Sequence, residues 1–334
     1  MQAAVCAELG PPSTVALQQV AVPQPRAGEV RVRIGAAAVN YTDVLLVAGG
    51  YQVKLEPPFV PGSEFAGVVD ALGEGVEASD GARFLGIGNE VSGTTHVGSF
   101  AEYVVVPAAA LSAKPDALDM GQAAAFSVAY RTAYHTLRSV ANVTAGETVL
   151  VLGAGGGVGL AAVQIAKALG CRVIAAASSR TKRSAAVDAG ADEAVDYTAD
   201  DFRARLREVA PTLDVVVDPV GGTATELSLR SMSPGGRLVT VGYASGSIPS
   251  IPLNLVLLKD VAILGFEVRT WVDRYAELAA RDNAELDELV RQGKVVPFVS
   301  RRFPLARTAV ALEHVAAREA VGKIVIDTHL EETS

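Results

Sequence analysis

Seven residues near the middle of the chain, Gly153–Gly159, read GAGGGVG. They stand between an apolar run, Thr148–Leu152, and a stretch with helical patterning, Leu160–Gly170. A strand, a glycine turn and a helix in this order present backbone N–H groups at a helix N-terminus, where they bind phosphate groups. The chemistry that this segment indicates is the binding of a dinucleotide pyrophosphate.

The motif differs from GxGxxG, because Ala154 stands in the place of the first glycine and only Gly156 and Gly159 fill the other two. With Gly157 and Val158 between them, these glycines are the candidates for the pyrophosphate site. A motif of this kind is also typical of an ordinary tight turn, so the surrounding elements must decide between the two interpretations.

Strand and helix patterns alternate downstream of the turn. Further strands are expected at Arg172–Ala177, Glu193–Tyr197, Asp214–Val220 and Arg237–Gly242. Strands that alternate with helices of about 10 to 15 residues predict a doubly wound parallel sheet. This context favours the dinucleotide site over a coincidental turn.

A basic segment, Ser178–Arg183 (SSRTKR), follows the second expected strand. An NAD-specific fold places an Asp or Glu there, which binds the ribose 2′-OH. Two hydroxyl groups and three cations instead suit a 2′-phosphate, which indicates NADP. The alternative is a serine helix cap followed by solvated basic residues.

Length and composition are typical of a two-domain enzyme. The chain has 334 residues, half of them apolar, and exceeds the roughly 250 to 300 residues at which a single core stops growing. No apolar run has the length of a membrane span and the N-terminus has no signal-peptide pattern, so we expect a cytoplasmic protein. Cys6 and Cys171 are expected to be separate thiols. A net charge of −8 disfavours nucleic acid as a partner.

The two ends of the chain are expected to form one domain. Gly28–Val39 and Glu64–Gly73 have β-strand patterning, and a last strand, Lys323–Asp327, suggests that the chain returns to its first domain. The predicted domains are residues 1–122 with 266–334, and residues 123–265.

Several blocks, in order along nearly the whole chain, carry a family resemblance. They are AAVNYTD (37–43), PFVPGSEFAGVV (58–69), GSFAEYVVVP (98–107), AGETVLVLGAGGGVGLAAVQIAKALG (145–170) and VGKIVI (321–326). The chain resembles the zinc-free quinone oxidoreductases of the medium-chain dehydrogenase/reductase superfamily. The resemblance implies an α/β fold, in which a GroES-like β-rich catalytic domain accompanies an inserted Rossmann domain. It also implies NADPH in the cleft between them and a homodimer.

The resemblance also assigns cofactor contacts. Those near the 2′-phosphate fall on Ser178, Ser179, Lys182 and Tyr197. Those near the nicotinamide and its cleft fall on Thr132, Val220, Val241, Gly242, Tyr243 and Phe266. Packing is an equal alternative for Tyr243, and capping or core packing for Thr132.

The metal-binding pattern of the zinc-dependent alcohol dehydrogenases in the same superfamily is missing. Asn40 and Ser63 stand where those enzymes have a Cys and a His, and neither is a usual zinc ligand. We therefore expect no metal. Without a Lewis acid, hydride transfer requires an acceptor that is already electron-poor.

Asn40, Tyr41 and Tyr51 are the predicted catalytic residues. The resemblance puts Asn40 and Tyr41 beside the substrate as polar orienting groups, and Tyr51, in the following GGY turn, borders the pocket. Tyr41 or Tyr51 is an optional proton donor, solvent being the other source. Sheet packing with a turn hydrogen bond is the alternative role, and Asp43 is expected to fix the local backbone.

Three functions agree with these motifs. The leading hypothesis is an NADPH-dependent reductase of a quinone or an α,β-unsaturated carbonyl. The alternatives are a reductase of acryloyl-CoA or another enoyl thioester, and a non-catalytic NADPH-binding protein. Gly242–Gly265 is the expected dimer contact, because its apolar run Ile248–Leu258 favours a partner, although the same run suits a core.

Overall fold

The structure is a computed structural model that describes residues 1–76 and 85–330. The chain forms two compact units. The first unit consists of Met1–Val128 and Val296–Ser334, and the second unit of Ala129–Val295. The chain therefore leaves the first unit once and returns to it near its end.

The second unit contains a six-stranded parallel sheet, with strand order β10-β9-β8-β11-β12-β13. Its strands are β8 (Thr148–Leu152), β9 (Arg172–Ala176), β10 (Glu193–Val195), β11 (Val215–Asp218), β12 (Arg237–Thr240) and β13 (Ala262–Gly265). Every residue of β8 is buried, which explains why its sequence is continuously apolar rather than alternating. The strand order reverses between β8 and β11, the place where such sheets bind ligands.

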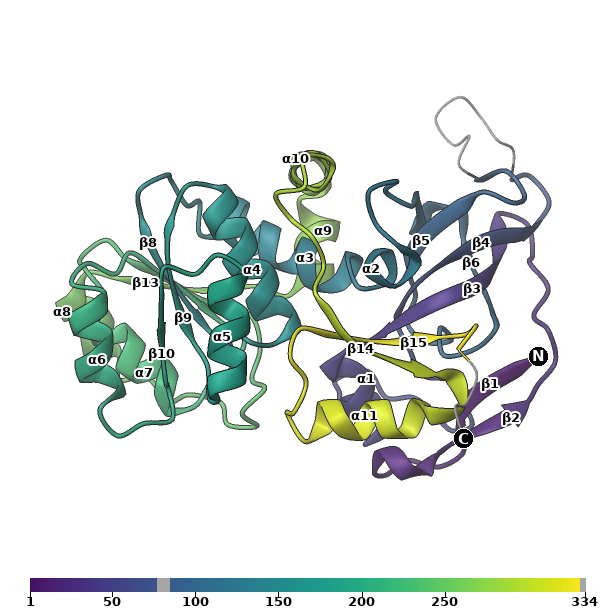
Figure 1. Ribbon diagram of the computed structural model, residues 1–334, viewed down its shortest axis with the longest axis horizontal. Coiled ribbons are helices and arrows are strands. Elements are labelled where there is room, and N and C mark those ends of the chain that lie inside the picture. The colour runs from purple at the N-terminus through teal and green to yellow at the C-terminus, as the bar shows by residue number, and fades with distance from the viewer. Residues whose placement is uncertain (77–84, 331–334) are drawn as a thin grey trace. The chain divides into compact units, whose positions relative to one another are not determined.

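Helices cover both faces of this sheet (Figure 1). One face carries α4 (Gly157–Ala168) and α5 (Arg180–Asp188), and the other carries α6 (Phe202–Val209), α7 (Thr223–Leu229) and α8 (Leu253–Lys259). The remaining helical segments are α3 (Ser127–His135), the π-helical turn η4 (Thr136–Val140), α9 (Val268–Arg274) and α10 (Ala276–Arg291).

Strands β8 to β12 lie where the sequence predicts them, with ends that differ by a few residues at most. The helix after the glycine turn differs, because it begins at Gly157 rather than at Leu160. Gly157 and Gly159 are poor helix formers, so the sequence pattern does not indicate the first turn of this helix.

The first unit is built on a seven-stranded sheet with strand order β14-β15-β3-β4-β5-β7, in which β6 also pairs with β3. Its strands are β3 (Glu29–Val39), β4 (Glu64–Leu72), β5 (Glu90–Thr94), β6 (Tyr103–Pro107), β7 (Leu111–Ala113), β14 (Val299–Pro304) and β15 (Lys323–Asp327). A separate pair consists of β1 (Gln2–Cys6) and β2 (Val15–Gln19). The helical segments are η1 (Pro12–Thr14), α1 (Tyr41–Val47), η3 (Ala108–Ala110), α2 (Met120–Ala124), η5 (Leu305–Arg307) and α11 (Thr308–Ala316).

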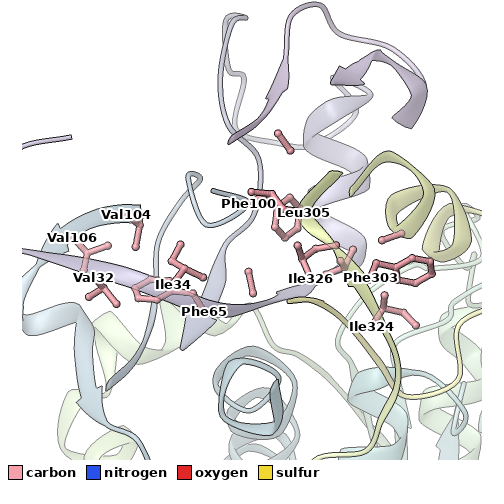
Figure 2. Packing of buried hydrophobic residues seen from close by; sticks show 14 of the residues in the cluster. Val32, Ile34, Phe65, Phe100, Val104, Val106, Phe303, Leu305, Ile324 and Ile326 are labelled. Carbon is pink, nitrogen blue, oxygen red and sulfur yellow. The ribbon is translucent and has the colours of Figure 1, made fainter. Parts of the chain in front are cut away.

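The core of the first unit joins the two ends of the chain. Strand β15 pairs antiparallel with β3, so that Ile324 lies opposite Val39. This pairing confirms the prediction that the chain returns to its first domain. Figure 2 shows Ile34 and Phe65 from the N-terminal part packed in one cluster with Ile326 from the C-terminal strand. Burying each such side chain contributes about 1.5–3 kcal/mol.

The unit boundaries lie at 128/129 and 295/296, whereas the sequence predicts 122/123 and 265/266. Residues 266–295 belong to the second unit because α10 packs against η4. The buried Asp282 of α10 binds Ser139 of η4. This side-chain pairing spans 143 residues and has no signature in the local sequence.

A β-rich unit combined with a doubly wound parallel sheet agrees with the predicted α/β fold class. Across the described residues, no helix is both long enough and apolar enough to cross a membrane.

Replacing Gly159 with Ala is expected to destabilise the second unit. A Cβ atom at this position would lie 2.1 Å from the Gly153 carbonyl oxygen, so α4 would have to move away from the turn. We expect a loss of about 1–3 kcal/mol in the free energy of unfolding, measured in urea. Gly156→Ala is the matched control, because its Cβ would meet only the Gly153 oxygen at 3.5 Å. Equal losses in the two variants would contradict this account.

Candidate functional site

The glycine turn between β8 and α4 has the geometry of an anion site. Gly153 has a φ of +62°, and Gly156 is the N-cap of α4. The Leu160 N–H group donates to the Gly156 carbonyl oxygen at 2.8 Å, so the N–H groups of Gly157, Val158 and Gly159 precede the first such helical bond. These donors stand at the positive end of the helix dipole, which favours a phosphate group.

The N-terminus of α5 lies beside this turn. A Cβ on Gly155 would come within 2.4 Å of Lys182 Cβ, so the two segments are in close contact. Ser178 is exposed, and Ser179 caps α5 by accepting a hydrogen bond from the Lys182 N–H group at 3.3 Å. The serine cap that the sequence left as an alternative is therefore present, and Lys182 lies next to the glycine turn.

Arg183 binds groups of the protein itself, whereas its place in the basic segment suggests a contact with the 2′-phosphate. Its guanidinium donates to Asp196 Oδ2 at 2.6 Å and to the Ala177 carbonyl oxygen at 3.0 Å. Of the three cations in the basic segment, this one is engaged by the acid that directly follows β10. Tyr197 follows Asp196 and is partly buried against the core of the second unit.

The segments that follow β11 and β12 are held together by Asp218, which is fully buried. Its Oδ1 atom accepts from the N–H groups of Val220 and Gly221, each at 2.8 Å, and its carbonyl oxygen accepts from the Val241 N–H group at 2.8 Å. Val220 also borders the glycine turn, because a Cβ on Gly153 would lie 2.7 Å from Val220 Cγ2. Gly242 and Tyr243 follow directly, and Tyr243 is exposed.

Thr132 and Phe266 both adjoin His135. Thr132 lies one turn earlier on α3, is buried, and accepts a hydrogen bond from Thr136 through its carbonyl oxygen at 2.7 Å. Phe266 follows β13, and its ring centroid lies 6.4 Å from that of His135. The Trp271 ring lies closer to His135, at 4.8 Å, and contacts Phe266 edge-on. Two predicted cofactor residues thus share one buried neighbour.

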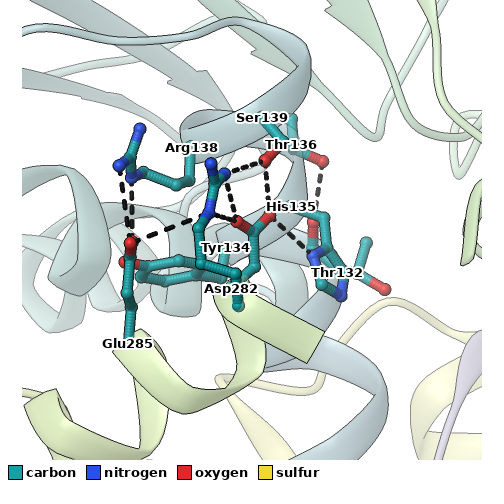
Figure 3. A network of polar contacts seen from close by, with 9 residues as sticks. Thr132, Tyr134, His135, Thr136, Arg138, Ser139, Asp282 and Glu285 are labelled. Carbon is teal, nitrogen blue, oxygen red and sulfur yellow. Dashed lines mark hydrogen bonds and ion pairs between the residues drawn. The ribbon is translucent and has the colours of Figure 1, made fainter. Parts of the chain in front are cut away.

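His135 is part of a polar network between α3, η4 and α10 (Figure 3). Its Nδ1 atom lies 3.0 Å from Asp282 Oδ2, which also accepts from Ser139 at 2.6 Å. Burial holds the pKa of His135 below its usual value, against the opposing effect of Asp282. A neutral imidazole beside a carboxylate donates its Nδ1 proton to it, so this contact fixes the orientation of the ring.

Two further hydrogen bonds in Figure 3, both accepted by Glu285 of α10, link the same elements. Glu285 Oε2 accepts from the Tyr134 hydroxyl at 2.8 Å and from Arg138 Nε at 2.9 Å. Burial, together with the Glu285 charge, raises the pKa of the Tyr134 phenol, which therefore remains a donor.

The predicted catalytic residues lie around α1 in the first unit. Asn40 is the N-cap of α1, Tyr41 is its first residue, and Tyr51 lies in the bend that follows the helix. All three are partly buried. Neither phenol has a hydrogen-bond partner within residues 1–76 and 85–330. The Asp43 carboxylate accepts the Asn40 backbone N–H group at 2.7 Å, which confirms that Asp43 fixes the local backbone.

The Asn40 side chain is held by a buried ion pair. Lys323 Nζ donates to Asn40 Oδ1 at 2.6 Å and to Glu64 Oε2 at 3.2 Å, and Asn40 Nδ2 donates to the same Glu64 oxygen at 3.2 Å. Glu64 Oε1 accepts the Val128 N–H group at 2.6 Å. Burying these charges is tolerable only because each has several partners. The amide of Asn40 therefore has one fixed orientation.

Sequence reasoning did not assign roles to Glu64 and Lys323, although both lie in the blocks that carry the family resemblance. Their partners come from β4, β15 and the start of α1, so the contact spans up to 283 residues. The charged residue Lys323 directly before the apolar run IVI is the signal that could have identified this contact.

The side chains around Asn40 also determine whether a metal ion could bind there. Within the described ranges, no group of three or more His, Cys, Asp and Glu side chains is placed to hold a metal ion. Ser63, the other position that departs from the zinc-dependent pattern, immediately precedes Glu64.

Comparisons with known proteins match both units. Residues 26–116 match the alcohol dehydrogenase GroES-like domain, and residues 157–282 match the zinc-binding dehydrogenase family. The quinone oxidoreductase-like protein 2 homolog of Nematostella vectensis is 33% identical over 332 residues, which cover 98% of this chain and 89% of that protein.

Solved structures agree with this match over the whole chain. The quinone oxidoreductase of Thermus thermophilus, also solved with NADPH, has a TM-score of 0.83 and 34% identity, covering 98% of this chain and 100% of that one. The Escherichia coli quinone oxidoreductase complexed with NADPH has a TM-score of 0.88 and 26% identity, covering 98% and 100% of the two chains.

Asp43→Asn is expected to change how stability depends on pH. Burial raises the pKa of Asp43 from 3.8 to about 7, against the opposing effects of the Asn40 N–H group, Ser63 and Lys323. Between these values the folded chain holds a proton that the unfolded chain releases, so the free energy of unfolding falls as pH rises toward 7. The neutral variant lacks this fall.

Relative to the wild type, Asp43→Asn should gain about 2 kcal/mol between pH 5.5 and pH 8.5, measured by urea unfolding. Asp116→Asn, at an exposed site, is the control and should follow the wild type at both pH values. A constant difference between Asp43→Asn and the wild type would show that Asp43 does not titrate in this range.

Proposed function

The chain belongs to the medium-chain dehydrogenase/reductase superfamily, among its quinone oxidoreductase-like members, and on this basis we propose that it is an NADPH-dependent reductase of a quinone or an α,β-unsaturated carbonyl. We also propose that it works without zinc. The observation that supports the proposal is the contact of the Lys182 side chain with the glycine turn, because it brings a cationic residue next to the proposed pyrophosphate site.

The residues of the glycine turn fit a dinucleotide. The space in front of Gly156 is open on the side where a Cβ would point, apart from the Gly153 oxygen at 3.5 Å, so a phosphate can approach the backbone there. Gly156, Gly157, Val158 and Gly159 would hold the pyrophosphate through their N–H groups and the helix dipole. This interpretation agrees with the NADPH complexes of the two related quinone oxidoreductases.

Preference for NADPH is assigned to the adjoining end of α5. Ser178, Ser179, Lys182 and Tyr197 would surround the 2′-phosphate. The ammonium of Lys182 supplies a point charge, and the exposed Ser178 hydroxyl supplies a donor. At the other end of the cofactor, Thr132, Val220, Val241, Gly242, Tyr243 and Phe266 would line the nicotinamide.

In the first unit, Asn40 would orient the acceptor carbonyl. Its Oδ1 atom already accepts from Lys323, so the amide can contact a ligand only through its Nδ2 group. One Nδ2 hydrogen is donated to Glu64, and the other has only a 3.5 Å contact with the Ala38 carbonyl oxygen. That hydrogen can stabilise an oxyanion. The phenol of Tyr41 or of Tyr51 is an optional proton donor in this proposal, with solvent as the alternative. Bound NADPH supplies the hydride.

The zinc-free part of the proposal rests on Lys323. Its ammonium is within hydrogen-bond distance of Asn40 Oδ1 and Glu64 Oε2, the two oxygens that a divalent cation at this position would need. A buried positive charge repels a second cation at such a distance. Both cysteines are buried thiols without a disulfide, which agrees with the proposed cytoplasmic location.

A homodimer is proposed through the outer edge of the second unit. Strand β13 is last in its sheet, so one of its edges lacks a neighbouring strand in the described part of the chain. Next to it in sequence, Ile248, Leu253, Leu257 and Leu258 are between 74% and 81% exposed. These four side chains are therefore on the surface of the single chain, whereas Ile251, Leu255 and Val256 of the same run pack against its core. An apolar face beside an open strand edge favours a second copy.

The proposed activity is tested by following NADPH oxidation with an ortho-quinone, an aliphatic enone and crotonyl-CoA as parallel acceptors, each repeated with NADH. We expect turnover of the quinone or enone, faster with NADPH. Lys182→Glu should raise KM for NADPH about tenfold or more while changing KM for NADH little, because it reverses a charge at the 2′-phosphate. Lys294→Glu, which makes the same charge change after α10, should change neither KM value.

Turnover of crotonyl-CoA alone would identify an enoyl-thioester reductase and reject the quinone hypothesis. Tight NADPH binding with no turnover of any acceptor would favour the non-catalytic alternative.

The dimer is tested with the double variant Leu253→Glu/Leu257→Glu, whose two positions are one turn apart on α8. We expect the wild type to sediment as a dimer and the variant as a monomer, because four charges would be buried in the contact. Leu278→Glu, on the exposed side of α10, should stay dimeric. A monomeric wild type would refute the proposed dimer.

A further inference from the structure

An acid lies beside the expected 2′-phosphate site, although the basic segment itself contains none. Val195 of β10 pairs with Ala176 of β9, and the Ala177 N–H group donates to the Val195 carbonyl oxygen at 3.1 Å. Asp196 therefore stands next to the end of β9, from which Ser178 continues. An acid at the end of β9 itself would accept a hydrogen bond from a ribose 2′-OH and repel a 2′-phosphate, and Asp196 stands beside that position, at the end of β10.

Both oxygens of the Asp196 carboxylate are already engaged. Oδ1 accepts from the Thr198 N–H group at 2.9 Å and from its hydroxyl at 2.6 Å. Oδ2 accepts from Arg183 Nη1 at 2.6 Å. Burial alone would raise the pKa of Asp196, but Thr198 and Arg183 hold it below its usual value, so the group is a carboxylate with its charge compensated.

Arg183 has the position to control this acid. The same nitrogen that binds Asp196 also donates to the Ala177 carbonyl oxygen at 3.0 Å, which fixes the guanidinium at the end of β9. Side-chain exposure of 26% for Arg183 and 31% for Asp196 leaves the pair partly shielded from solvent. Removing Arg183 would leave Oδ2 without its charged partner.

We propose that Arg183 determines cofactor specificity through Asp196: it occupies and neutralises a carboxylate that would otherwise select NADH. The proposal rests on the proposed function, because it concerns how the same cofactor site distinguishes two dinucleotides. Arg183 is a positioning residue here and does not itself bind the 2′-phosphate. Thr198 holds the other carboxylate oxygen and keeps Asp196 in place when Arg183 is removed.

If Arg183 acts through Asp196, its removal has a different effect on cofactor binding from the removal of a cation that binds the phosphate directly. When Asp196 Oδ2 is released, its charge repels the 2′-phosphate of NADPH, while the same atom becomes an acceptor for the 2′-OH of NADH. The affinities for the two dinucleotides should therefore change in opposite directions. Loss of a cation alone would weaken NADPH binding and would not tighten NADH binding.

The experiment measures Kd for NADPH and NADH by calorimetry, without turnover, for the full chain. Arg183→Leu should weaken NADPH binding and tighten NADH binding, changing the ratio of the two Kd values about tenfold, the effect expected for one charge near a solvated site. Arg183→Leu/Asp196→Asn should restore the wild-type ratio. Asp196→Asn alone should leave NADH binding unchanged and NADPH binding equal or tighter.

Lys167→Leu is the matched control. Lys167 Nζ binds Asp192 Oδ1 at 2.5 Å, and Asp192 precedes β10, at the opposite end of the strand from Asp196. Breaking this ion pair should leave the NADPH to NADH ratio unchanged. Thermal unfolding of each variant identifies any loss of folded protein, and Asp196→Asn tests the proposal even where Arg183→Leu does not fold.

Equal weakening of both dinucleotides in Arg183→Leu would overturn the proposal. So would a double variant whose ratio of the two Kd values stays at that of Arg183→Leu, because Arg183 would then bind the phosphate directly. Weaker NADH binding in Asp196→Asn would show that the acid is accessible in the wild type, which also contradicts it. A wild type that prefers NADH would instead refute the proposed NADPH dependence, independently of the Arg183 variants.

Discussion

The burial of Lys323 is the constraint on which the first unit depends. Its ammonium lies on the last strand of the chain and binds Asn40 and Glu64, which belong to the N-terminal part. An ammonium without partners would be costly to bury, so the place of β15 depends on Asn40 at the start of α1 and on Glu64 of β4 as well as on its strand pairing. The cofactor-type unit is inserted between these partners in the sequence. The buried charge therefore couples the return of the chain to the orientation of the Asn40 amide.

A similar arrangement recurs next to other residues of the candidate sites. Asp196 is held by Arg183 next to Tyr197, and Asp282 is held by Ser139 and His135 next to Thr132. In each case a carboxylate accepts a hydrogen bond from another element, and a residue with a proposed role in binding lies next to the carboxylate or to its partner. Fixed side chains of this kind lose little conformational freedom when a ligand binds.

The two units place their candidate residues by different physical means. In the second unit the important groups are backbone N–H donors, whose positions follow from strand and helix geometry and from the absence of side chains at Gly156 and Gly159. In the first unit they are side chains, whose positions depend on hydrogen bonds between residues far apart in sequence. Backbone sites of the first kind are visible as local motifs, whereas side-chain sites of the second kind are not.

The sequence by itself determined the parallel sheet, the glycine turn, the paired termini and the superfamily, because periodicity and turn residues act over short distances and the blocks that carry the family resemblance stand in order. It located Asn40, Lys182 and the apolar run near Leu257 as well. Only the tertiary structure decided that Arg183 is engaged by Asp196 and that α10 belongs with the second unit. It also decided that Lys323 holds Asn40. Such pairings depend on which strands become neighbours in the sheet, and no local pattern encodes that choice.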